Sequence, residues 1–217
     1  MKAIDRFLQR RRIAVAMGWI PSGSRVLDVG SSDGELFAAG ARAGRITSGL
    51  GIDPVPATAW VGEPFTFRRG TFPDAVEVDD GTFDVITMLA VFEHVPASAH
   101  PGWSRACHDL LRPGGRVIVT VPAAAVDPIL DVLHTLRLID GMALEEHHGF
   151  HAGDTPGAFG SERFALTRRR RFQLGLNNLF VLERRPGSVP GDGQTGSTAT
   201  STTARPVSSA STSSDPA

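Results

Sequence analysis

A short segment near the N-terminus constrains the fold of this chain more than any other feature. Between Val26 and Gly34 an apolar stretch runs into the pattern Asp-x-Gly-x-x-x-Gly, and a helix is expected to follow over Glu35–Arg42. A strand that enters a helix through a glycine turn is typical of open α/β sheets, which bind ligands at the carboxyl ends of their strands. The segment therefore predicts an α/β domain with a ligand site at this turn.

Strand and helix signals alternate along most of the remaining chain, which predicts a parallel sheet with helices on both faces. Strands are expected at 25–29, 48–53, 65–69, 83–89, 116–121, 164–172 and 179–184, and helices at 4–19, 35–42, 101–111 and 127–139. The glycines of Pro113-Gly114-Gly115 are expected to end the third helix. A turn at 175–178 suits an antiparallel hairpin. We therefore expect a Rossmann-like, doubly wound, mostly parallel seven-stranded sheet with a C-terminal antiparallel hairpin.

The first expected helix is amphipathic and rich in arginine. Its apolar face is expected to carry Phe7, Leu8, Val15 and Trp19, and its polar side Arg6, Arg10, Arg11 and Arg12. Charged helix faces are usually solvated, which is the simpler interpretation. A clamp for an anionic substrate is the alternative.

Composition divides the chain into two parts. The 217 residues are 41% hydrophobic, which is ordinary for a globular protein with a core. Residues 186–217 consist mostly of Ser, Thr, Gly, Pro and Ala. Such a segment cannot bury enough apolar surface to offset the entropy lost on ordering, roughly 1–2 kcal/mol per residue. We expect one domain at 1–185 and a disordered tail at 186–217.

Charge and cysteine usage bear on partners and location. The formal net charge is −1, so nothing in the overall charge favours nucleic acid or an anionic membrane as a partner. Cys107 is the single cysteine, which excludes an internal disulfide, and we expect it to be a small buried apolar group. Neither a secretory signal nor an apolar run long enough to span a bilayer is expected, so the expected location is the cytoplasm. The oligomeric state stays open.

A second acidic residue ends the second expected strand. Asp53 closes the sequence GLGID, roughly 20 residues after the glycine turn, where nucleotide-binding folds hold ribose hydroxyls. Asp28 supplies negative charge at the first turn, where a cationic ligand would sit. A carboxylate there would repel a pyrophosphate, and the sequence lacks the pattern Gly-x-Gly-x-x-Gly. An NAD-dependent oxidoreductase is therefore disfavoured.

Four blocks of the sequence resemble the class I S-adenosylmethionine (AdoMet)-dependent methyltransferases, especially the group called methyltransferase type 11. The blocks are Val26–Phe37, Gly49–Asp53, Phe83–Val95 and Leu111–Pro122. The resemblance extends from about Val26 to Arg184 and implies AdoMet as the cofactor. It identifies the superfamily but not the substrate.

The resemblance also implies which residues bind the cofactor. Those of the first turn line its methionine and ribose side, Asp53 binds the ribose diol, and Pro54 flanks the adenine. The loop after the third strand closes over the adenine, and the end of the fourth strand lies beside the methionine moiety. The full set is Asp28, Gly30, Ser31, Ser32, Gly34, Asp53, Pro54, Gly70, Thr71, Phe72, Met88, Leu89 and Ala90.

Two residues depart from the pattern of that family. Ser32 stands where the family often has glycine, and a left-handed backbone at a non-glycine residue costs about 1 kcal/mol. Thr71 stands where the family often has an acid beside the adenine. Either Asp74 substitutes for that acid or the adenine amino group meets only backbone.

Histidines supply the candidate catalytic groups. Positioning alone supplies much of the rate of a methyl transfer, and a general base helps when the acceptor is a hydroxyl. His147 and His148 lie in the segment Glu145–His151, a region that commonly forms part of the acceptor pocket in class I methyltransferases. We expect one of them to act as a base or to orient the acceptor. A structural role and a metal site with a neighbouring glutamate stay open, although the spacing fits no standard zinc pattern and we expect no metal. His94, after the fourth strand, is a weaker candidate.

The sequence thus predicts an AdoMet-dependent methyltransferase that acts on a small molecule, with oxygen as the expected acceptor atom. A non-catalytic AdoMet-binding protein is one alternative, given the departures at Ser32 and Thr71. A nucleic-acid methyltransferase is another, but it would usually show a basic groove or an added recognition domain. The sequence does not identify the acceptor.

Overall fold

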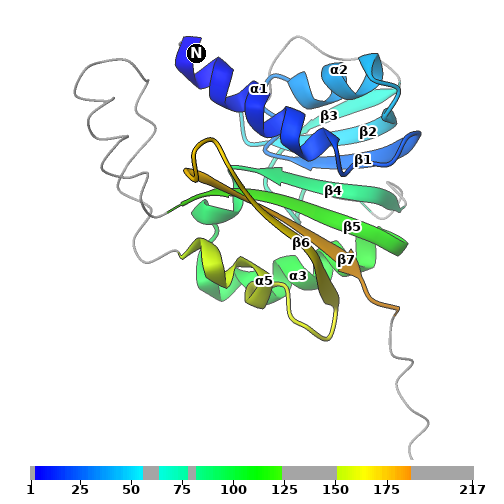
Figure 1. Ribbon diagram of the computed structural model, residues 1–217. Coiled ribbons are helices and arrows are strands. Elements are labelled where there is room, and N and C mark those ends of the chain that lie inside the picture. The colour runs from blue at the N-terminus through cyan, green and yellow to red at the C-terminus, as the bar shows by residue number, and fades with distance from the viewer. Residues whose placement is uncertain (1–2, 56–63, 78–81, 124–150, 187–217) are drawn as a thin grey trace, which may run out of the picture. The chain divides into compact units, whose positions relative to one another are not determined.

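A computed structural model describes residues 3–55, 64–77, 82–123 and 151–186 (Figure 1). The helix expected at 127–139 and the tail from residue 187 onward lie outside these residues. The helices and strands, in chain order, are α1 (Ala3–Met17), β1 (Ser24–Val29), α2 (Glu35–Arg42), β2 (Ile46–Asp53), β3 (Phe65–Arg69), β4 (Phe83–Leu89), α3 (His100–Leu110), β5 (Leu111–Pro122), α5 (Thr155–Ala158), β6 (Phe164–Phe172) and β7 (Asn177–Arg184). Short 3-10 helices are η2 (Phe92–His94), η3 (Ala97–Ala99) and η6 (Ala152–Asp154).

The strands form one seven-stranded sheet in the order β3-β2-β1-β4-β5-β7-β6. The pairs from β3 to β5 are parallel, and β7 runs antiparallel to both β5 and β6. The Rossmann-like sheet and its C-terminal hairpin are therefore confirmed. The chain moves outward from β1 to β3 and then returns to place β4 on the other side of β1. That reversal opens a crevice at the carboxyl ends of β1 and β4, the usual ligand position in such sheets.

Helices cover both faces of the sheet (Figure 1). α1 and α2 lie on one face, where their apolar residues pack with Val26, Val85 and Ile118 in one hydrophobic cluster. α3 and α5 lie on the other face, where the second cluster contains Cys107 and Phe159. Alternate residues of each strand face opposite sides of the sheet, so each buried strand contributes to both clusters. Cys107 is buried among apolar side chains, as expected.

Several boundaries differ from those expected. β5 begins at Leu111, so the segment Pro113–Gly115 lies within the strand and α3 ends before it, at Leu110. The expectation that these glycines end the helix was therefore wrong. β7 begins at Asn177, which places the hairpin turn at 173–176 rather than at 175–178. The backbone of this turn uses a left-handed conformation at Gln173 and Leu174, which residue types alone do not indicate.

The buried face of α1 also differs from the expected one. Ile13 and Ala16 are buried, whereas Phe7 is 61% exposed. The reason is the position of the helix: its C-terminal half covers the apolar body of the sheet, and its N-terminal half extends over the carboxyl edge, where the lining is polar. None of the helices in the described ranges has the length and apolar character needed to cross a bilayer.

Candidate functional site

The turn after β1 has a backbone that glycine favours. Gly30 and Gly34 have φ values of +76° and +74°, and Ser32 between them has a φ of +46°. A Cβ at Gly30 would lie 2.4 Å from Cγ2 of Val91, so this glycine makes room for a side chain of the loop after β4. The left-handed conformation considered for Ser32 is thus present. The turn carries a small strain at Ser32, on the order of 1 kcal/mol.

Asp53 ties this turn to the end of β2. Its Oδ2 accepts the N–H of Ser32 at 2.8 Å, and its Oδ1 accepts the N–H of Val55 at 2.8 Å. A carboxylate has about four acceptor positions, so these two bonds leave room for hydroxyl donors of a ligand. The geometry is compatible with the expected role of Asp53 toward a ribose diol, and it adds a structural role that the sequence did not indicate.

Asp28 is a buried carboxyl group at the end of β1. Its side chain is on the α1 face, the residue is 3% exposed, and its Oδ1 accepts the hydroxyl of Thr87 at 2.6 Å. Burial raises the pKa of Asp28 to about 7, the Thr87 hydrogen bond lowers it, and the charges of Asp53 and Asp33 raise it further. A buried acid with few partners is stabilised in its charged form when a cation binds beside it.

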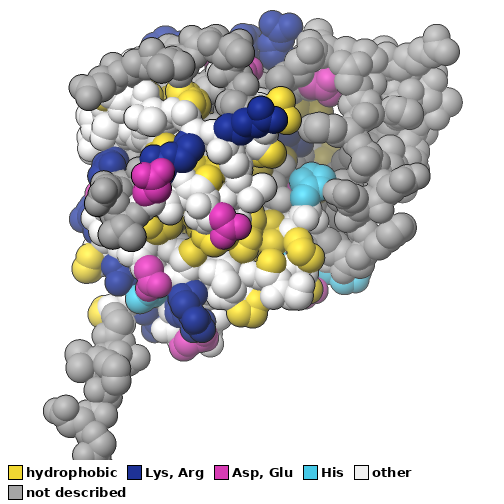
Figure 2. Space-filling model, turned by 180° about the vertical axis from the view of Figure 1, so that it is seen from behind, with side chains coloured by type: hydrophobic (Ala, Val, Ile, Leu, Met, Phe, Trp, Pro, Cys, Tyr) yellow, Lys and Arg dark blue, Asp and Glu magenta, His cyan; other side chains and the backbone are white. Residues whose placement is uncertain are grey.

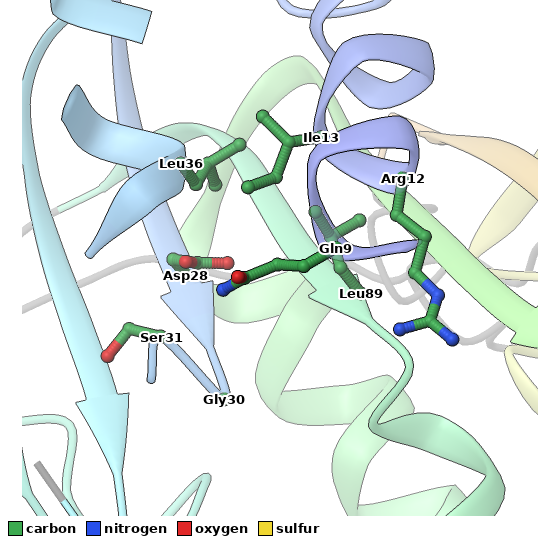
Figure 3. Close-up of a pocket in the computed structure, with 8 residues that line it drawn as sticks. All are labelled: Gln9, Arg12, Ile13, Asp28, Gly30, Ser31, Leu36 and Leu89. Carbon is green, nitrogen blue, oxygen red and sulfur yellow. The ribbon is translucent and has the colours of Figure 1, made fainter. Parts of the chain in front are cut away.

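Asp28 lines a hollow beneath α1, which we call the α1 hollow. About 340 Å³ of the hollow is not filled by protein atoms, and part of this space is open to solvent. Gln9 extends from α1 toward Asp28, and the Arg12 guanidinium points down on the other side (Figure 3). The lining residues are Gln9, Arg12, Ile13, Asp28, Gly30, Ser31, Leu36 and Leu89. A cation and an anion therefore border the same space at the carboxyl ends of β1 and β4.

The two residues that α1 contributes were not among the expected site residues. Gln9 donates through Nε2 to Asp33 at 2.9 Å, which ties α1 to the glycine turn, and its Oε1 has no partner among the described residues. Arg12 Nε likewise has none. Burial lowers the pKa of Arg12, while the charges of Glu93 and Asp5 raise it, and an arginine stays charged at neutral pH. The run of arginines was the sequence signal, but it did not single out Arg12.

The expected adenine-side residues are placed at the ends of β2 and β3. The Gly70 N–H donates to the Asp53 carbonyl at 3.1 Å, which brings the two loops together. Pro54 and Thr71 are exposed beside them, as a ligand-facing position requires. Phe72 is different, because its ring is buried against Trp103 with ring centroids 5.0 Å apart. Its side chain therefore belongs to the hydrophobic cluster on the α3 face.

The three residues expected at the end of β4 have different surroundings. Leu89 lines the α1 hollow. Met88 is fully buried in the cluster on the α3 face, so only its backbone lies near the hollow. Ala90 has a φ of +59°, and its N–H donates to the Thr120 carbonyl at 2.9 Å, which fixes the loop against β5.

The candidate catalytic residues fall in two regions. His147 and His148 lie outside the described residues. His94 is exposed at the end of η2, whereas its neighbour Glu93 is 5% exposed. The sequence favoured the histidine because of its chemistry, but the turn of η2 buries the acid instead. Among the described residues, no group of three His, Cys, Asp or Glu side chains is arranged to hold a metal ion.

The charges around the α1 hollow complement those of the amino-acid end of AdoMet, which carries a carboxylate, an ammonium and a positively charged sulfur. Arg12 matches the carboxylate and Asp28 matches the cationic groups, since charged pairs at such partly dry sites bind strongly. The unpaired atoms Arg12 Nε and Gln9 Oε1 supply a donor and an acceptor for the ligand. Asp53, next along the same edge of the sheet, suits the ribose.

Comparison with known sequences connects the chain with methyl transfer. A family model described as a methyltransferase domain matches residues 2–155, more than half of the chain. The ubiquinone biosynthesis O-methyltransferase of Pseudomonas aeruginosa is 33% identical over 128 residues, which are 54% of this chain and 54% of that protein. That of Nitrosococcus oceani is 30% identical over 139 residues, 59% of this chain and 58% of that protein. The chain thus spans about half the length of these curated relatives.

Solved structures share the fold at low sequence identity. The 1,6-didemethyltoxoflavin-N1-methyltransferase of Burkholderia thailandensis, determined with S-adenosylhomocysteine (AdoHcy), has a TM-score of 0.61 at 19% identity and covers 82% of this chain and 78% of its own. The magnesium protoporphyrin IX methyltransferase of Synechocystis, also determined with AdoHcy, has a TM-score of 0.59 at 18% identity. The match covers 83% of this chain and 85% of that protein. The family model and the sheet topology agree: this chain belongs to the methyltransferase domain family, within the class I AdoMet-dependent fold.

Proposed function

We propose that this protein transfers the methyl group of AdoMet to an oxygen atom of a small-molecule acceptor. The observation that supports it most is the α1 hollow, where Arg12 and Asp28 place opposite charges at the carboxyl ends of β1 and β4. Both curated relatives described above are O-methyltransferases by name, which favours oxygen as the acceptor atom. The family membership supports the reaction type but not the identity of the acceptor.

The residues of this chain would mainly bind and orient. AdoMet supplies a methyl group bonded to a positively charged sulfur. When the methyl group is transferred, the sulfur keeps the electron pair of the carbon–sulfur bond. Arg12 would hold the carboxylate of the ligand, Asp28 would face its positive charge, and Asp53 would accept the ribose hydroxyls. Fixing one reactant against the other is itself a large part of the rate in such displacements. His147 or His148 remains proposed as a residue that orients the acceptor.

Other functions receive less support. In Figure 2 acidic and basic side chains are interspersed with apolar ones on the face shown, which is not the continuous basic surface typical of nucleic-acid binding. A non-catalytic AdoMet-binding protein would need the same hollow, so only turnover distinguishes it from an enzyme. We propose the cytoplasm as the location.

Calorimetry with purified protein tests the cofactor. We expect AdoMet and AdoHcy to bind with micromolar dissociation constants and NAD to show no comparable binding. Arg12→Ala should weaken AdoHcy binding by roughly tenfold or more, because a hydrogen bond to a charged group contributes about 1.5–3 kcal/mol. The matched control is Arg11→Ala, an exposed arginine one residue earlier on α1, which should bind AdoHcy like the unmodified protein. Binding of NAD without AdoMet would contradict the proposal.

A panel of phenols, alcohols, carboxylic acids and amines, read by mass spectrometry, tests the reaction. We expect a mass increase of one methyl group on an oxygen acceptor together with stoichiometric AdoHcy. Formation of no methylated product from any class, with AdoMet bound, would favour the non-catalytic binding protein.

A further inference from the structure

Three buried polar side chains lie near the α1 hollow and remain unexplained by cofactor binding. Glu93 Oε2, Thr120 Oγ1 and Asn177 Oδ1 have no hydrogen-bond partner among the described residues. Glu93 is 5% exposed, Thr120 is fully buried, and Asn177 is 4% exposed. More than nine in ten buried polar groups in proteins are paired, so unpaired atoms on neighbouring elements point to a missing partner.

Thr120 and Asn177 lie on the face of the sheet that α1 covers. Thr120 is two residues after Ile118, which packs in the α1-side cluster, and it pairs in register with Leu89 of the α1 hollow. Asn177 Nδ2 donates to Gln173 Oε1 at 2.6 Å, and Gln173 Nε2 donates at 3.5 Å to a carbonyl of α1. Thr120 therefore lies next to Leu89 at the edge of the hollow, and Asn177, which pairs with Pro122, lies further along the same face of the sheet.

Glu93 reaches the same region from η2. Its neighbour Phe92 packs on the α3 face, against Phe159 with ring centroids 5.0 Å apart. Glu93 in contrast interacts electrostatically with Arg12, which lines the α1 hollow. An acid, a hydroxyl and an amide from three different elements are thus buried near residues that line the α1 hollow: Glu93 near Arg12, and Thr120 next to Leu89. An acceptor with two or more polar groups would satisfy their unpaired atoms.

We infer that Glu93 is the group that takes the proton of the acceptor hydroxyl, and that Thr120 and Asn177 bind a second polar group of the acceptor. The inference rests on the proposed function. The acceptor oxygen forms a bond to the methyl carbon as the carbon–sulfur bond breaks. The O–H bond of the acceptor breaks as well, and its proton passes to Oε2 of Glu93. The products are the methyl ether, neutral AdoHcy and a protonated Glu93, which later returns the proton to water.

The surroundings of Glu93 suit this role. Burial raises the pKa of Glu93 to about 7, while the N–H bonded to its carboxylate and the charge of Arg12 lower it. A carboxylate with a pKa near the working pH accepts a proton better than an ordinary exposed one and is still ionised in a large fraction of molecules. The exposed neighbour His94 has no comparable burial.

Two probe acceptors test the inference: catechol, which is mostly un-ionised at pH 7.5, and 4-nitrocatechol, which is largely ionised there. Glu93→Gln should lower turnover of catechol by about 10²–10⁴-fold, the usual contribution of a general base. It should lower turnover of 4-nitrocatechol by less than tenfold, because that acceptor has already lost its proton. AdoHcy affinity by calorimetry should stay within about threefold, and Glu162→Gln, an exposed acid before β6, serves as the control.

Each other outcome overturns the inference. Equal losses with both probes would show a structural role, and unchanged turnover of catechol would show that another group takes the proton. Loss of unmodified-enzyme turnover in EDTA with recovery in Mg²⁺, together with no Mg²⁺ effect on Glu93→Gln, would show that Glu93 holds a metal instead. Methylation of neither probe by the unmodified enzyme would refute the assigned acceptor chemistry, whereas failure to bind AdoHcy would refute the proposed function itself. If urea unfolding shows that the Gln variant is not folded, Glu93→Asp takes its place. Its turnover of catechol must then fall more than its turnover of 4-nitrocatechol.

Discussion

Replacing Asp28 by asparagine should make the ligand-free protein more stable at neutral pH while it weakens cofactor binding. The asparagine amide oxygen can still accept the hydroxyl of Thr87, which lies 2.6 Å from Oδ1. The substitution therefore removes the buried charge and little else. Asp28 is 3% exposed, and burial is the largest cause of its raised pKa.

The pKa of Asp28 rises from an ordinary value of 3.8 to about 7 in the folded protein. Well below pH 3.8 the carboxyl is protonated in both folded and unfolded chains and costs no stability. Between pH 4 and 7 the unfolded chain loses this proton first, so the free energy of unfolding falls as pH rises. The folded and unfolded pKa values differ by roughly three units, and each unit corresponds to about 1.4 kcal/mol. Above pH 7 the buried charge therefore lowers the free energy of unfolding by an amount on the order of 4 kcal/mol.

Urea unfolding followed by circular dichroism at pH 4, 6 and 8 measures this effect without ligand. Asp28→Asn and the unmodified protein should have similar free energies of unfolding at pH 4, and the variant should gain up to about 4 kcal/mol at pH 8. Asp109→Asn, an exposed acid on α3, is the control and should show no such trend. Calorimetry should show weaker AdoMet binding by the Asp28 variant. A variant that is less stable than the unmodified protein at pH 8 would refute the reasoning.

Three further substitutions test the turn and the sheet. Ser32→Gly should raise the free energy of unfolding by roughly 0.5–1 kcal/mol, because it relieves a φ of +46°, and AdoMet affinity measured by calorimetry should not change. Asp53→Ala should weaken AdoMet binding tenfold or more in the same assay and also lower stability, since the N–H groups of Ser32 and Val55 lose their acceptor. Gly49→Ala should lower the urea midpoint strongly, because its Cβ would lie 2.4 Å from the Val26 carbonyl oxygen; Gly102→Ala, with nothing within 4 Å, should not.

The sequence alone was sufficient for the architecture. β3, β4, β6 and α2 have the predicted bounds, and β1 and β2 differ only at their first residues. Local patterns carry this information, because an apolar run of strand length or a glycine turn restricts the backbone wherever it occurs. The sequence also placed the glycine turn and Asp53 at the ends of the first two strands, and the carboxyl ends of adjacent parallel strands meet at one edge of a sheet. The 2.8 Å bond between Asp53 and the Ser32 N–H is the direct result.

The depth of individual side chains could not be predicted in the same way. Phe7 was expected to be buried and is exposed, whereas Arg12, expected on the solvated side, lines the α1 hollow. Helical periodicity gives two faces but does not say what each face meets. In this protein the polar hollow, rather than the apolar body of the sheet, lies beneath the middle of α1, at Gln9, Arg12 and Ile13.

The sequence therefore determined the order of strands and helices and the turn at which the cofactor is expected to bind. Tertiary structure decided which polar groups line the hollow at that turn, Gln9 and Arg12 from α1. It also decided which polar groups are buried: Glu93 rather than His94 from η2, and Thr120 from β5. The physical reason is that backbone conformation depends mainly on neighbouring residues. Burial, and with it the raised pKa of Asp28 and Glu93, depends on segments that are far apart in the chain and meet only when the sheet and its helices have assembled.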